Sequence, residues 1–195
     1  MRVRHGRDRA AVYTAKRTLT RDGLETMFAT NHLGPFLLTN LLYDLSELPS
    51  PSRILTITAP STTKLSFDDL QGTVHWNASR AFGASKMCNL LFTYLLARRL
   101  EGTGVTVNAV HPGLVKSNLM REALPPIRWM ANLVASAPEH AADGPVYLAS
   151  SPDVANVTGA FFKGKKQIAS SQYSHAPAFQ RRLWLMSARL ANIEE

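Results

Sequence analysis

The segment SRAFGASKMCN, residues 79–89, carries a lysine that could assist proton chemistry. Lys86 follows Phe82 by four residues, and residues four apart share one face of a helix. An ammonium in such a position lowers the pKa of a hydroxyl beside it, but Phe82 has no O–H. A positioned acid or base contributes ~10²–10⁴-fold in rate. Position 82 therefore bears directly on whether the chain is an enzyme.

The remaining reactive residues do not indicate metal or thiol chemistry. The six histidines, at positions 5, 32, 75, 111, 140 and 175, are scattered without the spacing of metal ligands. The single cysteine, Cys88, excludes an internal disulfide and falls among apolar residues, where we expect a packed thiol. A chain without disulfides suits a reducing compartment. We therefore predict no metal site and a cytoplasmic location.

Residues 79–89 resemble the active-site helix of the short-chain dehydrogenases/reductases, in which a tyrosine stands four residues before a lysine. Four other segments resemble that family in the expected order: NHLG at 31–34, FDDL at 67–70, HPGLVKS at 111–117 and ASSP at 149–152. The second and fourth are typical of its retinol-dehydrogenase-like branch. The resemblance covers about residues 20–190.

This resemblance implies an NAD(P)-dependent oxidoreductase that acts on the alcohol/carbonyl pair of an apolar substrate. In such an enzyme Lys86 would bind the cofactor ribose, and Asn31 would hold a water molecule in a proton relay. The cofactor-binding residues that it implies are Lys86, Pro112, Gly113, Val115 and Ser117. The catalytic residues that remain are Asn31 and Lys86.

Two catalytic positions depart from the family. The tyrosine is replaced by Phe82, and the serine at the end of the preceding strand is replaced by Ala59. Thr58 or Ser61 could supply a hydroxyl if the following loop takes a different path. Tyr94 cannot replace the missing phenol, because twelve helical residues place it ~18 Å away along the axis. Tyr13 falls outside the resembling segments. The departures favour an impaired enzyme or a pseudoenzyme.

The first half of a dinucleotide-binding fold is not found in the sequence. That half carries the glycine-rich turn that holds the pyrophosphate, and no GxGxxG occurs among the eleven glycines. The resemblance therefore implies a truncated form of the domain, and two explanations remain open. The chain is the remnant of a broken gene, or a partner supplies the glycine-rich half.

The periodic spacing of apolar residues predicts the helices and strands that must position these residues. An amphipathic helix is expected over 22–46, interrupted at Pro35, and others over 79–101 and 138–150. We expect Ser79 to cap the second helix. Strands are expected over 53–58, 105–110 and 157–163, and 112–138 is expected to be a substrate loop. The fold class predicted is α/β, a partial Rossmann-like, doubly wound parallel sheet that lacks the first βαβ half. Strand 53–58 should then form an unpaired edge.

Pro35 directs attention to the carbonyl of Asn31. Proline has no N–H to donate to the carbonyl four residues earlier, which here belongs to Asn31. That carbonyl could hold the relay water that the resemblance implies. Alternatively, the proline is a tolerated kink that exposes one carbonyl to solvent.

The net charge of +8 is concentrated at the N-terminus. Residues 1–21 contain seven arginines and lysines and one acidic residue, so the rest of the chain carries about +2. We divide the chain into a basic arm, 1–20, and the C-terminal portion of a short-chain dehydrogenase/reductase domain, 21–195. The arm is expected to be a solvated tail or the result of a displaced start codon, and contact with phosphate or an anionic membrane is the less favoured alternative. Nucleic acid is an unlikely partner, since no aromatic residues for base stacking interleave with the charges.

The two long helices favour self-association. Helices 22–46 and 79–101 present more apolar surface than an incomplete sheet can cover, so we expect a homodimer or larger assembly through them. A non-catalytic assembly subunit is the alternative to an enzyme. No apolar run approaches the ~18 residues that a membrane span needs.

Overall fold

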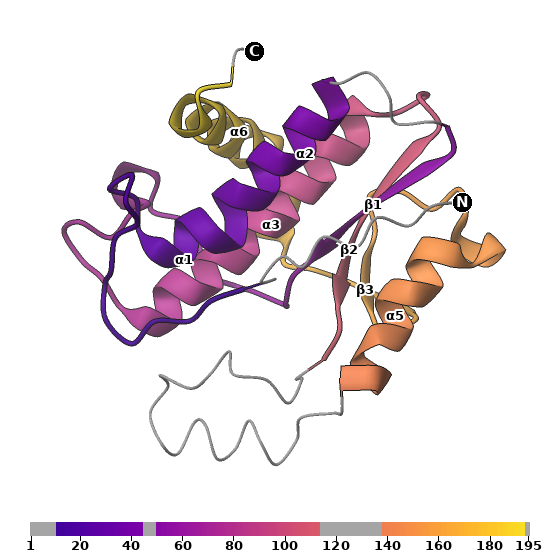
Figure 1. The fold of residues 1–195 in the computed structure, drawn as a ribbon, viewed down its shortest axis with the longest axis horizontal. Coiled ribbons are helices and arrows are strands. Elements are labelled where there is room, and N and C mark those ends of the chain that lie inside the picture. The colour runs from indigo at the N-terminus through magenta and orange to yellow at the C-terminus, as the bar shows by residue number, and fades with distance from the viewer. Residues whose placement is uncertain (1–10, 45–49, 114–137, 194–195) are drawn as a thin grey trace.

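The computed structural model describes residues 11–44, 50–113 and 138–193, and a four-stranded sheet lies at its centre (Figure 1). The strands follow the order β1, β2, β3, β4 and comprise Ser52–Ile57, Val105–His111, Phe161–Lys163 and Lys166–Ile168. The first three are parallel, and β4 returns antiparallel to β3. The predicted α/β, Rossmann-like class is confirmed, with this hairpin as an addition that makes the sheet mixed.

Helices cover both faces of the sheet (Figure 1). The helices are α1 Thr26–Phe28, α2 Gly34–Asp44, α3 Ala78–Arg99, α5 Pro138–Ser150 and α6 Pro177–Ala191. The first three pack together with α6 on one side, and α3 contacts β1 and β2. On the opposite side α5 contacts the same two strands. This arrangement buries β2, whose residues Val107, Ala109 and Val110 are fully enclosed.

The helix predicted over 22–46 is broken into three pieces. Glu25 caps its start by accepting a hydrogen bond from the Phe28 N–H, and a π-helical turn, Ala29–Leu33, separates α1 from α2. Within this turn the Gly34 N–H bonds the carbonyl of Ala29, five residues earlier. The wider turn lies directly before Pro35, which cannot donate to the helical ladder.

The predicted helix 79–101 begins one residue earlier, and Ser79 is not its cap. Asn77 has extended backbone angles, and its side chain accepts the Arg80 N–H at 3.0 Å. Ser79 is already the second helical residue and is exposed. The prediction of the cap was therefore wrong, because asparagine and serine cap equally well and the chain direction before the helix selects between them.

Helix α6 was not predicted, and it closes the core over α3. The rings of Phe36, Phe92 and Trp184 form a cluster with centroids 5.0–5.8 Å apart. Through these contacts nearly all of α3 from Ser85 to Ala97 is buried within the chain. The expectation that helix 79–101 offers open apolar surface to a partner was therefore wrong.

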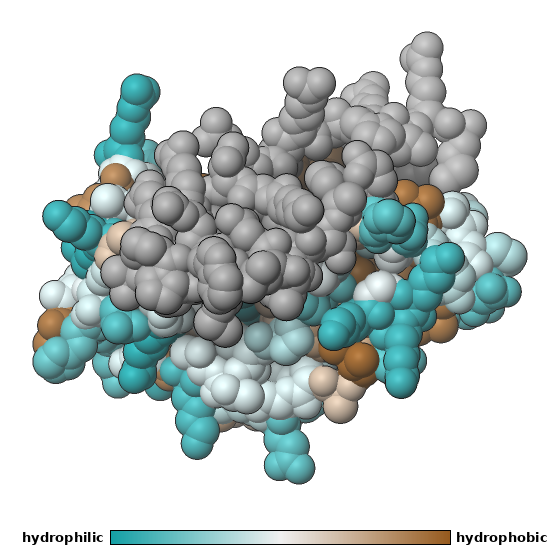
Figure 2. Space-filling view, turned by 90° about the horizontal axis from the view of Figure 1, so that it is seen from below, coloured by the Kyte–Doolittle hydropathy of each residue, from teal (hydrophilic) through white to brown (hydrophobic). Residues whose placement is uncertain are grey.

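Strand β1 ends the sheet, as predicted, because among the described residues no strand pairs with its second edge. Its apolar residues Ile54, Leu55 and Ile57 are only half-buried. Hydrophobic side chains on the face drawn in Figure 2 form small separate groups between hydrophilic ones. None of the described helices combines the length and the apolar character needed to cross a bilayer.

Candidate functional site

Lys86 lies in the middle of α3 with only 5% of its surface exposed. Its Nζ lies 5.0 Å from the centre of the Phe82 ring, one turn earlier. Among the described residues the ammonium has no hydrogen bond, and besides its contact with this ring its charge acts on His111. Burial lowers the pKa of Lys86 to about 8. The cation therefore retains its capacity to bind an oxygen-bearing ligand.

The Asn31 side chain is fully used in holding two segments together. Its Oδ1 accepts the Val12 N–H at 2.7 Å, and its Nδ2 donates to the Val12 carbonyl and to Ser85 Oγ, both at 3.0 Å. Ser85 directly precedes Lys86, and its hydroxyl donates to the carbonyl of Phe82. Asn31 therefore ties the N-terminal segment to the turn of α3 that carries the lysine.

The Asn31 carbonyl, to which Pro35 cannot donate a hydrogen bond, is buried and accepts a hydrogen bond from a side chain. Asn31 is fully buried, and its carbonyl accepts a hydrogen bond from Asn89 Nδ2 at 3.0 Å. The alternative of a kink that exposes this carbonyl to solvent was therefore wrong. A carbonyl oxygen has two lone pairs, so the bond from Asn89 does not by itself use its full capacity to accept. The role of Asn31 in a water relay stays a prediction.

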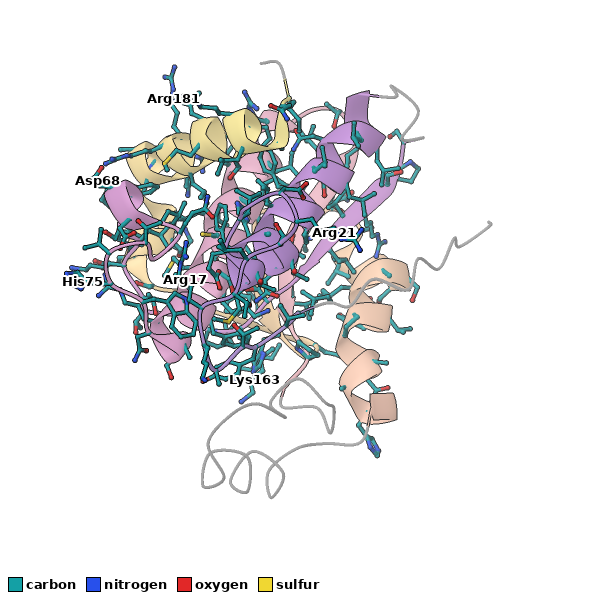
Figure 3. All side chains as sticks on the ribbon, turned by 60° about the vertical axis from the view of Figure 1, so that its left-hand side comes forward. Arg17, Arg21, Asp68, His75, Lys163 and Arg181 are labelled. Atoms are coloured by element: carbon teal, nitrogen blue, oxygen red, sulfur yellow. The ribbon has the colours of Figure 1, made fainter. Side chains whose placement is uncertain are left out.

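Residues 11–20 are packed against the helices and are not a solvated tail. Besides the bonds from Val12, Arg17 Nε donates to the carbonyl of Gln71, and Leu19 forms a β-bridge with Glu25. Figure 3 shows Arg17 among side chains at the end of the molecule where α1 and the 66–77 loop meet. The expectation for the arm was thus wrong over these residues. Residues 1–10 lie outside the described part, and the boundary at 20 stays a prediction.

The ring of Tyr13 packs against Phe82, which stands where the family has its tyrosine. Its ring centroid lies 5.7 Å from that of Phe82, with the rings inclined by 64° in an edge-to-face contact. The sequence analysis set this residue aside because it falls outside the resembling segments, and sixty-nine positions separate the two aromatics. The available signal was the run Ala10-Ala11-Val12-Tyr13, an apolar interruption of an otherwise basic segment.

The end of β2 brings His111, Pro112 and Gly113 to the same region. His111 is half-buried, and burial lowers its pKa, as do the charges of Lys163 and Lys86, against a hydrogen bond with the Thr58 backbone. Figure 3 shows Lys163 at this end of the sheet. Gly113 has φ +88°, a left-handed conformation that favours glycine. Val115 and Ser117, predicted to contact the nicotinamide, lie outside the described residues.

Neither hydroxyl proposed to replace the serine at Ala59 is free. Thr58 Oγ1 donates to the carbonyl of Lys86 at 3.0 Å, and Ser61 Oγ donates to the carbonyl of Gly83 at 2.8 Å. Each hydroxyl has a single proton. These side chains therefore attach the loop after β1 to α3, and neither is available as a donor in this arrangement.

His32, within the NHLG segment, has a structural position. Its ring lies between Asn89 Oδ1 at 3.3 Å and Ser187 Oγ at 2.9 Å, and it is 1% exposed. Burial lowers its pKa to about 4. A neutral His32 thus links the π-helical turn to α3 and α6.

The described residues fit the nicotinamide side of a dinucleotide. A buried ammonium at Lys86 and the strand end at His111–Gly113 offer a cation and a close backbone approach for the ribose and the nicotinamide. No described segment provides a glycine-rich turn for the pyrophosphate. Among the described residues, no group of three His, Cys, Asp or Glu side chains could hold a metal ion, and the absence of a metal site stays a prediction.

Comparison with known proteins finds relatives over most of the chain. The short chain dehydrogenase family matches residues 10–127. Retinol dehydrogenase 13 from Homo sapiens is 41% identical over 199 residues, which cover 95% of this chain and 59% of that protein. The structure of an uncharacterized protein from Mycobacterium paratuberculosis has a TM-score of 0.71 and 26% identity, over 94% of this chain and 65% of that chain. The angucycline C-6 ketoreductase LanV, solved with NADP, shares the fold at a TM-score of 0.55 and 24% identity, over 79% of this chain and 57% of that chain.

Two points follow from these matches. The family match starts at residue 10, so it includes the segment with Val12 and Tyr13. The chain spans about 59% of the length of the human relative. On the extent of the family match and on the retinol dehydrogenase relatives, this chain belongs to the short-chain dehydrogenase family and to its retinol-dehydrogenase-like members.

Proposed function

We propose that the chain takes part in NAD(P)-dependent oxidoreduction of the alcohol/carbonyl pair of an apolar substrate such as a retinoid. The observation that supports this most directly is the buried Lys86, whose charge has no described hydrogen-bond partner and faces position 82. A buried charge destabilises a fold, so its retention beside the family's active-site position favours a ligand-binding role. The relatives named as retinol dehydrogenases support a retinoid as the first substrate to test.

Each site residue has a defined role in this proposal. A bound nicotinamide would supply or accept the hydride. Lys86 would bind its ribose oxygens, Pro112 and Gly113 would lie against the ring, and Asn31 would hold the relay water on its second carbonyl lone pair. Val115 and Ser117 are proposed for the same contact with the nicotinamide.

The activity proposed for the isolated chain is low. The phenol and the serine hydroxyl of the family are replaced by Phe82 and Ala59, and each positioned proton donor or acceptor contributes ~10²–10⁴-fold in rate. The 195 residues contain no GxGxxG turn, so we expect weak binding of both NADH and NADPH.

Deuteride transfer tests the proposal. The chain is incubated with [4-²H]NADH or [4-²H]NADPH and all-trans-retinal, and retinol is analysed by mass spectrometry for deuterium. We expect slow enzyme-dependent incorporation with at least one cofactor and none with the Lys86→Met variant. Arg80→Met, on the exposed start of the same helix, is the matched control and should retain the activity. Absence of transfer with both cofactors would reject the proposal for this chain.

A second candidate, a non-catalytic assembly subunit, is supported by α2. Leu38, Leu41 and Leu42 on this helix expose 45%, 52% and 49% of their surfaces. We propose that α2 forms the oligomer interface, either with a second copy or with a partner that carries the glycine-rich half. A cytoplasmic location stays a prediction that rests on the single, buried Cys88.

A further inference from the structure

The contact between Tyr13 and Phe82 offers a source for the missing proton. Phe82 occupies the position of the family's phenol and cannot donate. Tyr13 is half-buried, and the edge-to-face contact sets its ring 5.7 Å from that of Phe82. The ammonium of Lys86 lies 5.0 Å from the centre of the same Phe82 ring. Phe82 thus contacts both a phenol and a cation.

The backbone fixes this tyrosine in place. Val12, its neighbour, is held through both its N–H and its carbonyl by the fully buried Asn31. Asn31 in turn bonds Ser85, next to Lys86. The same amide therefore sets the segment that carries Tyr13 and the helical turn that carries the cation. Such pre-organisation is what a positioned acid requires.

The other tyrosines with described side chains have different partners. The Tyr94 hydroxyl bonds Ser170 Oγ at 2.7 Å, and the Tyr173 oxygen accepts the Leu65 N–H at 3.2 Å. Tyr147, on α5, lies beneath the ammonium of Lys165. Of these phenols, Tyr13 alone has a described contact with Phe82.

We propose that Tyr13 supplies the proton that the family's tyrosine supplies from position 82; this rests on the oxidoreductase function proposed above. A bound nicotinamide would supply the hydride for reduction of a carbonyl carbon, and the electron pair of the broken C=O π bond would pass to the oxygen. That oxygen takes the Oη proton of Tyr13, which leaves an alcohol and a phenolate. A proton from water then returns to the phenolate.

A bound carbonyl probe tests the contact without requiring turnover. Acetophenone labelled with ¹³C at the carbonyl is added to the full chain, and its ¹³C resonance is followed by NMR. A hydrogen bond from Tyr13 moves the carbonyl resonance downfield on binding to the wild type. The shift should be lost in Tyr13→Phe, which keeps the ring, and kept in Tyr94→Phe, the control. An equal shift in Tyr13→Phe, or no shift with the wild type, would overturn the proposal.

Deuteride transfer provides the second readout. Tyr13→Phe should reduce the rate by about 10²-fold or more, and Phe82→Tyr in the same chain should recover activity by returning a phenol to the position before Lys86. Such recovery is not expected if Tyr13 only supports the fold. Full activity in Tyr13→Phe would overturn the assignment. A Tyr13-dependent NMR shift without any wild-type transfer would support the carbonyl contact and reject the oxidoreductase function instead.

Discussion

At the scale of single residues, the site is built around a charge that destabilises the fold. Lys86 is enclosed in α3, where burial lowers its pKa from 10.5 to about 8, and it still carries a proton at neutral pH. His32 is also buried, and its ring contacts Asn89 of the same helix. Burial lowers its pKa to about 4, so it is neutral at neutral pH. The two residues respond to pH in separate ranges, which allows their contributions to be measured separately.

Replacing Lys86 by methionine should raise the free energy of unfolding at pH 7. Below pH 8 the lysine is protonated in both the folded and the unfolded state, so the folded protein bears the full cost of desolvating the charge. At 1.36 kcal/mol per pKa unit, this cost is about 3 kcal/mol. Between pH 8 and 10.5 the folded state loses this proton first, and stability rises with pH. Urea unfolding should show that Lys86→Met has a higher unfolding free energy than the wild type at pH 7, and that this difference disappears at pH 10.5. An equal difference in unfolding free energy at both pH values would contradict the presence of a buried charge at Lys86.

The contribution of His32 should be lost on acidification. Between pH 6.5 and about 4 the unfolded chain binds a proton on this residue and the folded chain does not, so the unfolding free energy falls by about 3 kcal/mol. His32→Gln, which retains hydrogen-bonding groups but does not titrate, should fall less over this range. Denaturant unfolding at pH 7, 5.5 and 4 measures the difference. If the unfolding free energies of the two proteins fall in parallel with pH, His32 is not a buried neutral imidazole in the folded state.

At the scale of elements, helix α3 positions the site, and its first turn depends on one cap. The Asn77 side chain accepts the Arg80 N–H, and Phe82 and Lys86 follow within the next turns. From the loop after β1, Thr58 and Ser61 donate to carbonyls of the same helix and fix that loop. The register of the site therefore depends on where α3 begins.

Removing the cap should destabilise the protein, and removing the neighbouring serine should not. Asn77→Ala is expected to lower the unfolding free energy by about 1 kcal/mol, since it leaves the Arg80 N–H without its acceptor. Ser79→Ala, two residues away on the exposed first turn, is expected to change it by less than about 0.5 kcal/mol. Thermal and urea unfolding of both variants give the comparison. A larger loss in the serine variant would place the cap at Ser79 after all.

At the scale of the whole molecule, the apolar surface is unevenly covered. Helix α6 encloses α3 through Leu183 and Trp184, while α2 leaves leucines exposed on its outer side. Burial of apolar area is worth ~25 cal/mol per Å². Covering the exposed leucines of α2 in an interface would therefore stabilise an assembly.

Introducing charges on α2 should dissociate the proposed oligomer. Leu41→Glu with Leu42→Glu is expected to convert a dimer into a monomer in sedimentation experiments, because two carboxylates cannot be buried without partners. The matched control is Leu185→Glu on α6, a residue with 42% exposure, which should leave the size unchanged. A wild-type chain that is monomeric at all concentrations would remove the basis for this interface.

Local patterns in the sequence determined the elements that carry the site. The β-branched runs predicted β1 and β2, and the apolar periodicity predicted α3 and α5 to within a few residues. The spacing of Phe82 and Lys86 placed them on one helical face, as the 5.0 Å contact shows. These features depend on residues that are close in the chain, so a single sequence contains the necessary information.

Tertiary packing alone decided how the segments meet. It directed Asn89 to the carbonyl left by Pro35 and laid α6 over α3. It also brought Tyr13 beside Phe82, across sixty-nine residues. No local periodicity encodes such contacts, because they arise when the buried faces of distant elements exclude water together and their polar groups must then find partners.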